Sequence, residues 1–199
     1  MVDLLIKILT FTINFISKDI FITFGFYSFL YIVFSFFLKK SSKAYEFDNI
    51  SCQLISFSGL VYFSCFLLSI VFILHKGEEE KFSLINRMFG PYWFLFFLQP
   101  ITYLIITQLL RFKKVKNSKI ARLLLVPFFI LTYEILTILT TSIHRDYLPS
   151  SWGISFSLPD MMIYFPTKLL FYLIVVVVFY IITEQLKKFR SKNKQNTNI

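Results

Sequence analysis

Four apolar runs long enough to cross a lipid bilayer constrain this chain more than any other feature of its sequence. The runs extend over Ile20–Leu38, Ile50–Leu74, Tyr92–Leu110 and Leu123–Ile143. A helix of about 20 apolar residues crosses a bilayer, whose interior offers no water to satisfy exposed backbone groups. Because 56% of the 199 residues are hydrophobic and only 16% are charged, a soluble domain would lack polar surface. The sequence therefore predicts an all-α integral membrane protein.

Three further segments complete the predicted architecture. A shorter apolar run extends from about Lys168 to Thr183, so we expect a bundle of four to five transmembrane helices within residues 19–186. Residues 1–18 place polar side chains at helical steps of three and four, which predicts an amphipathic helix lying in the membrane interface. These side chains are Asp3, Lys7, Thr10, Asn14 and Lys18. Residues 187–199 are polar and basic, and we expect a disordered cytoplasmic tail.

The basic residues predict how the helices are oriented. Of the 21 Lys and Arg residues, the majority lie in residues 39–43, 111–122 and 187–194, which alternating helices place on one side of the membrane. By the positive-inside rule this side faces the cytoplasm, and the C-terminus with it. We expect Lys76–Gly90, with its run of three glutamates, to be a solvated outer loop, and residues 144–167 to face outward as well. Since the net charge of +10 is concentrated in short loops between helices, it does not predict nucleic-acid binding.

One carboxylate, Glu134, lies near the middle of the run Leu123–Ile143. A charged residue at this depth costs about 2.5–3.5 kcal/mol on insertion scales, so it usually has a partner and a function. Helical steps from Glu134 reach further polar residues on the same face, up to the outer end of the run. These residues are Thr137, Thr141 and Arg145, with His144 and Asp146 beside them. The pattern indicates a polar stripe from the membrane interior to its outer surface.

The preceding apolar run offers Glu134 two partners, Gln99 and Tyr103, which are one helical turn apart. At a rise of about 1.5 Å per residue, Glu134 lies roughly 13 Å below the outer end of its helix, Gln99 roughly 10 Å and Tyr103 roughly 16 Å. One interpretation is a site that handles protons or a polar headgroup and opens outward. The other is a structural cluster that holds two helices together, with the threonines bonding to their own helical turn.

Other patterns are less specific. Cys52, Ser56 and Gly59 form a small-residue face on the second apolar run, which predicts a close helix contact. His75 and His144 both fall near the outer end of a predicted span, so a haem with two histidine ligands is conceivable, but histidines at helix ends are more often interfacial residues. The chain has no phosphate-binding loop, zinc-protease motif or nucleophile elbow. We therefore assign no catalytic residue and no metal, and expect no covalently bound cofactor.

Three fragments, taken together, resemble one helical hairpin of the NrfD-like membrane subunits, the family that includes the quinol-binding subunits of alternative complex III. The first is Gly90-Pro91-Tyr92-Trp93, and the second is Gln108-Leu109-Leu110 followed by Phe112-Lys113-Lys114-Val115. The third is Glu134 followed by Ser142-Ile143-His144-Arg145-Asp146-Tyr147-Leu148-Pro149-Ser150-Ser151-Trp152. Their order and spacing cover about Gly90–Gly153, a third of the chain. The last string is the most specific of the three.

The resemblance implies a subunit of a respiratory-type redox complex in the bacterial inner membrane, similar to half of an NrfD-like quinol-interacting subunit. Implied partners are the lipid bilayer, other membrane subunits and a periplasmic iron–sulfur or cytochrome subunit, with quinone or quinol as the ligand. The polar path would include Glu134, Thr141, His144, Arg145 and Asp146, with Tyr92, Trp93 and Trp152 around the quinone ring. The chain departs from the family at Ile135, where an arginine normally follows the glutamate. This departure favours the alternative of a non-catalytic membrane scaffold or assembly protein.

Overall fold

The computed structural model describes residues 2–37, 42–90, 93–130 and 158–196, and every element within these ranges is a helix. In chain order the elements are α1 (Val2–Asn14), η1 (Phe15–Phe21), α2 (Ile22–Phe37), α3 (Ser42–Leu74), α4 (Glu78–Phe89), α5 (Trp93–Leu109), α6 (Lys113–Asn117), α7 (Lys119–Ile130) and α9 (Leu158–Asn196). Within these ranges, three stretches are long and apolar enough to cross a membrane, namely Val2–Phe36, Lys43–Leu74 and Tyr164–Leu186. The predicted all-helical class is thus confirmed. The number of spans stays a prediction, since most of the predicted run Leu123–Ile143 lies outside the described residues.

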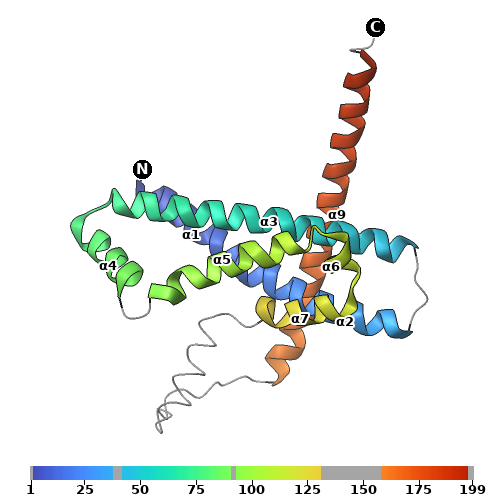
Figure 1. Ribbon diagram of the computed structural model, residues 1–199, viewed down its shortest axis with the longest axis horizontal. Coiled ribbons are helices and arrows are strands. Elements are labelled where there is room, and N and C mark those ends of the chain that lie inside the picture. Colours follow the sequence, from blue (N-terminus) through green and yellow to red (C-terminus); the bar gives the residue numbers. More distant parts are fainter. Residues whose placement is uncertain (1, 38–41, 91–92, 131–157, 197–199) are drawn as a thin grey trace.

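Two long antiparallel helical stretches form the frame of the molecule (Figure 1). The first consists of α1, η1 and α2 in direct succession, and the second is α3. Asp3 at the start of α1 forms an ion pair of 3.1 Å with Lys76, just after α3 ends. At the opposite end, Tyr27 of α2 contacts Asp48 near the start of α3. The two stretches therefore run side by side along most of their length.

The N-terminal helix does not end where the sequence predicts. We expected a separate amphipathic helix over residues 1–18, but the chain continues through the π-helical turn η1 into α2 without a break. A π-helical turn keeps the chain helical while shifting which side chains face the neighbouring helices. In η1 this turns Ile16 and Ile20 into the core and places Asp19 towards α9. Whether α1 lies in the membrane interface stays a prediction.

Helices α5 and α7 pack against this frame, α5 along α3 and α7 along α2 (Figure 1). Aromatic side chains fill the space where these helices meet. The ring of Phe21 lies 4.8 Å from that of Tyr103, 5.6 Å from that of Tyr62 and 5.9 Å from that of Phe129. Aromatic pairs at such separations contribute about 0.5–1.5 kcal/mol each beyond the burial of their area. This cluster joins η1, α3, α5 and α7 into one core.

The small-residue face predicted for Cys52, Ser56 and Gly59 is confirmed as a helix contact. At Gly59 the backbone of α3 approaches α5 so closely that an added Cβ atom would lie 1.9 Å from Oγ1 of Thr107. One turn earlier, the amide of Gln108 donates a hydrogen bond of 2.9 Å to the carbonyl oxygen of Ser56. Small residues permit this approach and leave backbone groups accessible to a neighbouring side chain.

The predicted outer loop Lys76–Gly90 is instead mostly helical, because α4 extends over Glu78–Phe89. The three glutamates occupy the first turn of α4, and Arg87 lies in its last turn. Both positions oppose the partial charges at the ends of the helix dipole and so stabilise the helix. A hydrogen bond from Lys76 lowers the pKa of Glu80, so their ion pair of 2.8 Å persists below the usual titration range of a glutamate. The expected exposure of the glutamates is nevertheless confirmed.

Helix α9 crosses the frame and continues well beyond it (Figure 1). Its apolar part, Tyr164–Leu186, is longer than the predicted fifth run from Lys168 to Thr183. The sequence predicts disorder from residue 187, whereas α9 remains helical to Asn196. Lys, Arg and Gln have high helix propensities, which favour continuation of an already formed helix. Tyr172 and Val176 are the fully buried residues of α9 and mark where it packs on the frame.

Candidate functional site

Three of the predicted site residues, Trp93, Gln99 and Tyr103, lie within the described part of the chain, all on α5. Tyr103 is 1% exposed and packs against Phe21 and Tyr62, while Gln99, one turn away, is half-buried. Trp93, at the start of α5, is exposed. On α5, Tyr103 is therefore turned towards the interior and Trp93 outward, and the role of these residues in a site stays a prediction.

The other predicted site residues lie outside the described residues. They are Tyr92, Glu134, Thr141, His144, Arg145, Asp146 and Trp152. Helix α7, which leads towards Glu134, is described as far as Ile130. Its Phe129 packs against Phe21, which in turn packs against Tyr103. The end of α7 thus enters the same core as the polar face of α5, but the pairing of Glu134 with Gln99 and Tyr103 stays a prediction.

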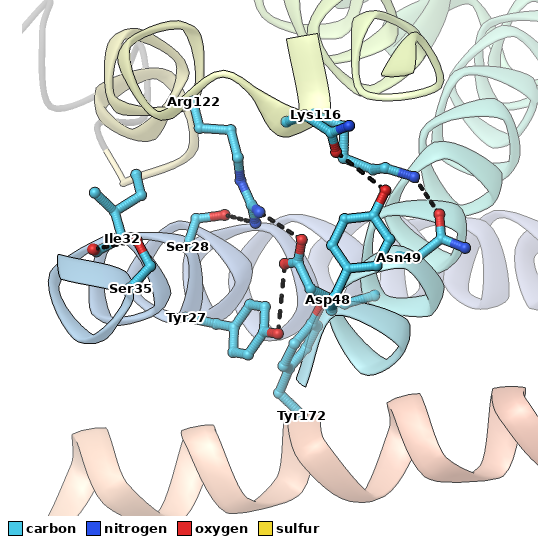
Figure 2. A network of polar contacts seen from close by, with 12 residues as sticks. Tyr27, Ser28, Ile32, Ser35, Asp48, Asn49, Lys116, Arg122 and Tyr172 are labelled. Atoms are coloured by element: carbon cyan, nitrogen blue, oxygen red, sulfur yellow. Dashed lines mark hydrogen bonds and ion pairs between the residues drawn. The ribbon is translucent and has the colours of Figure 1, made fainter. Parts of the chain in front are cut away.

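A buried ion pair that was not predicted from the sequence joins α7 to the first part of α3 (Figure 2). Nη1 of Arg122 in α7 donates to Oδ2 of Asp48 in α3 at 2.7 Å, and both side chains are 3% exposed. Nη2 of Arg122 donates to Oγ of Ser28 at 2.9 Å, and the hydroxyl of Tyr27 donates to Oδ1 of Asp48 at 3.5 Å. We call these four residues, Tyr27, Ser28, Asp48 and Arg122, the Asp48 cluster. It joins α2, α3 and α7.

The surroundings of the Asp48 cluster hold the arginine in place. The guanidinium carbon of Arg122 lies 4.9 Å from the centre of the Tyr31 ring, a cation–π contact. About one turn after Asp48 on α3, the hydroxyl of Ser51 shares a hydrogen bond with the hydroxyl of Tyr172, which links α3 to α9. Charges removed from water are stable only when paired and hydrogen-bonded. Here Arg122 is paired and bonded through Nη1 and Nη2, while its buried Nε has no partner among the described residues. The cluster is therefore suited to hold α2, α3 and α7 together.

Further polar contacts beside this cluster hold α6 against α3 and α7 against α2 (Figure 2). Nζ of Lys116 donates to Oδ1 of Asn49 in α3, and Nζ of Lys119 donates to the carbonyl oxygen of Ser35 at 3.1 Å. The sequence predicts that the charges of residues 111–122 lie in a loop and orient the helices. Instead, Lys116 and Arg122 are buried, at 9% and 3% exposure. The available signal was Asp48, an acidic residue among the basic segments of the predicted cytoplasmic side.

A second ion pair, between Asp19 and Lys168, joins η1 to α9. Asp19 is one of the residues that the π-helical turn directs towards α9, and its side chain is 21% exposed. Phe171 packs edge-on against Phe15 beside this pair, with 6.0 Å between ring centres. The pair and the rings together fix where α9 crosses the first stretch.

We expect Asp19→Asn to weaken this joint by at most about 1 kcal/mol, because the pair is only partly shielded from solvent. Thermal unfolding in detergent, repeated with Lys168→Gln and the double variant, measures the coupling energy of the two residues. Lys18→Gln, a change at the exposed neighbouring residue, serves as the charge-matched control. Additive effects of the two single changes would show that the pair does not hold α9.

Within the described ranges, no group of three or more His, Cys, Asp and Glu side chains could hold a metal ion. Nδ1 of His75 lies 2.8 Å from the carbonyl oxygen of Val71, as is common for a histidine at a helix end. The other histidine considered for haem, His144, is outside the described residues, so that possibility is untested.

An apolar cavity of about 440 Å³ lies between α2 and α9, with Phe26, Phe29 and Phe165 in its wall. Its lining suits an apolar ligand or a lipid chain.

Comparison with protein-family models, with curated proteins and with solved structures found no match for this chain. The resemblance of Gly90–Gly153 to an NrfD-like hairpin stays a prediction. The described structure by itself establishes an all-helical protein whose long apolar helices are suited to a membrane.

Proposed function

We propose that this protein is a membrane subunit of a respiratory-type redox complex, similar to half of an NrfD-like quinol-interacting subunit, which acts together with partner subunits. The observation that supports the proposal most is the inward orientation of the polar face of α5. Tyr103 is buried in the core that the end of α7 also enters. Glu134 lies four residues beyond the end of α7 as described. In the proposed site its carboxylate would meet the hydroxyl of Tyr103 and the amide of Gln99 in this core. This is the arrangement that the spacing of polar residues along the two apolar runs predicts for Glu134.

In the proposed site, Glu134, Thr141, His144, Arg145 and Asp146 form a polar path for protons from the membrane interior to the periplasm. Tyr92, Trp93 and Trp152 would surround the quinone ring near the outer surface. Exposed Trp93 at the start of α5 is suited to contact an apolar ligand that arrives from the lipid. Quinol oxidation releases two electrons and two protons, so a periplasmic iron–sulfur or cytochrome subunit would accept the electrons.

Large apolar side chains cover the outside of the helices and suit contacts with lipid or with other membrane subunits. Examples are Phe57 on α3, Trp93 on α5 and Ile174 on α9, which are 57%, 54% and 61% exposed. The proposed location is the bacterial inner membrane with the C-terminus in the cytoplasm. This orientation follows from the basic residues near the α6–α7 corner and at the end of α9.

Purification in a mild detergent tests the proposal directly. Mass spectrometry of the sample should identify a membrane subunit together with a periplasmic redox protein, and organic extraction should recover quinone. An absorption spectrum of the same sample tests for haem. A sample that contains neither a redox subunit nor quinone would contradict the proposal.

The second candidate function is a non-catalytic membrane scaffold or assembly protein. It is favoured by ion pairs between helices, since Asp48 with Arg122 and Asp19 with Lys168 each serve to join helices. The absence of an arginine after Glu134, where Ile135 stands, points the same way.

Two substitutions distinguish the candidates. A redox subunit should lose quinol-dependent electron transfer with Glu134→Gln while still assembling with its partners. A scaffold should tolerate Glu134→Gln, whereas Trp152→Ala should abolish assembly. Co-purification and quinol-dependent reduction of the partner subunit, measured for both variants, give opposite patterns for the two candidates.

A further inference from the structure

A cavity of about 460 Å³ opens between α3 and the corner where α5 passes into α6. It belongs neither to the predicted polar stripe nor to the Asp48 cluster. One wall of the cavity is formed by α3 and the other by the corner. The lining residues are Asn49, Cys52, Gln53, Ser56, Phe57 and Leu60 of α3, and Leu110, Arg111, Lys113 and Lys116 of the corner. The cavity therefore combines three cations with polar and apolar side chains.

The polar part of the lining extends along α3 from Asn49 to Ser56, and the apolar part follows from Phe57 to Leu60. Lys116 is bonded to Asn49, and Arg111 to Gln108, whose side chain contacts Ser56, so the cations lie beside the polar part. Phe57 and Leu60 lie at the other end of its lining and are 57% and 43% exposed. From Asn49 to Leu60 the helix rises about 17 Å, at about 1.5 Å per residue. This length accommodates a polar headgroup followed by the upper part of an acyl chain.

Within the described residues, the cations of this cavity form no ion pair with a carboxylate. No carboxylate in the described part of the chain lies within ion-pair distance of Arg111, Lys113 or Lys116, in contrast to Arg122, which pairs with Asp48. Lys116 is only 9% exposed, and its ammonium contacts the neutral amide of Asn49 and, at 5.9 Å, the ring of Tyr45. A cation so far removed from water favours a nearby anion.

We infer that this cavity binds an anionic phospholipid, with its phosphate at Arg111, Lys113 and Lys116 and an acyl chain along Phe57 and Leu60. Basic pockets between transmembrane helices on the cytoplasmic side are suited to acidic headgroups. The apolar end distinguishes this site from one for a soluble anion, which would gain nothing from Phe57 and Leu60. The inference depends on the membrane location of the protein and not on the proposed redox function.

Native mass spectrometry of the full-length protein in detergent, titrated with phosphatidylglycerol or phosphatidylcholine, tests the inference. Phosphatidylglycerol should bind more tightly, and each of Arg111→Gln and Lys113→Gln should weaken its binding about fivefold, or about 25-fold together. Both side chains are exposed, so neither change should disturb folding. Lys114→Gln is the matched control, because Lys114 lies on the same short helix but does not line the cavity.

Three outcomes would overturn the inference. Equal binding of phosphatidylcholine would show that the headgroup charge is not recognised. An equal loss with Lys114→Gln would show that only the general positive charge of this end attracts the lipid. Displacement of the lipid by glycerol phosphate at similar concentrations would show that the cavity takes a free phosphate and makes no use of the acyl chain.

Discussion

Replacing Arg122 by methionine is expected to lower the free energy of unfolding by about 3–5 kcal/mol, the usual cost of leaving one member of a buried ion pair alone. The change leaves the carboxylate of Asp48, whose side chain is 3% exposed, without its cation in a region closed to water. Ser28 loses its guanidinium partner as well. SDS titration in mixed micelles, followed by pulse proteolysis, measures the loss. We expect it to be the largest effect of any single substitution considered for this protein.

The double variant Asp48→Leu with Arg122→Met should recover most of that loss. A buried ion pair replaced as a whole by apolar residues of similar volume is often neutral, because the cost of removing both charges from water disappears with them. Lys114→Met, at an exposed position on α6, is the control for loss of one positive charge and should cost less than about 0.5 kcal/mol. The Asp48 cluster would not hold the helices together if Arg122→Met lowered the free energy of unfolding no more than this control. The same would follow if the double variant were less stable than either single variant.

The helical class and the membrane-length helices follow from the sequence because both depend on local pattern. Run length and apolar composition are properties of consecutive residues, and the predicted runs Ile50–Leu74 and Lys168–Thr183 fall within the observed stretches Lys43–Leu74 and Tyr164–Leu186. The small-residue face at Gly59 is local in the same way, since Ser56 and Gly59 fall on one side of a single helix. Its contact partner on α5 could not be predicted from that face alone.

The Asp48 cluster could not be predicted by the same reasoning, because Asp48 and Arg122 are 74 residues apart in sequence. The positive-inside rule assigns basic residues to a side of the membrane but says nothing about which of them turns inward to meet a carboxylate. The extent of the first helix depends on a distant contact too. The sequence places the end of the amphipathic segment at Lys18, but the next residue, Asp19, has its partner in Lys168 of α9.

Helix α4 is a different case, because its signals were present in the sequence. Gly77 precedes three glutamates, and Arg87 stands near the end, which is the usual charge pattern of a helix start and stop. The run Glu78–Glu80 was interpreted only as a solvated loop. The predicted stripe around Glu134 lies outside the described residues and stays a prediction.

Replacing Gly59 by alanine should lower the free energy of unfolding by about 1–3 kcal/mol, the range found for overpacked cores. The new methyl group would lie 1.9 Å from Oγ1 and 2.6 Å from Cβ of Thr107. Since Cβ cannot move without the backbone, α3 and α5 would have to separate. That separation would also stretch the hydrogen bond between Gln108 and Ser56. The same SDS titration measures the loss.

The exchange variant Gly59→Ala with Thr107→Gly should restore most of the lost stability. It moves the bulk from one helix to the other, and the gain in helix propensity at 59 offsets the cost of about 1 kcal/mol for glycine within α5. Gly77→Ala is the control, because a Cβ atom there would meet only the end of the Glu80 side chain, at 3.2 Å. If Gly59→Ala were as harmless as Gly77→Ala, close contact at Thr107 would not hold α5 against α3. The orientation of the polar face of α5, on which the proposed function depends, would then need another cause.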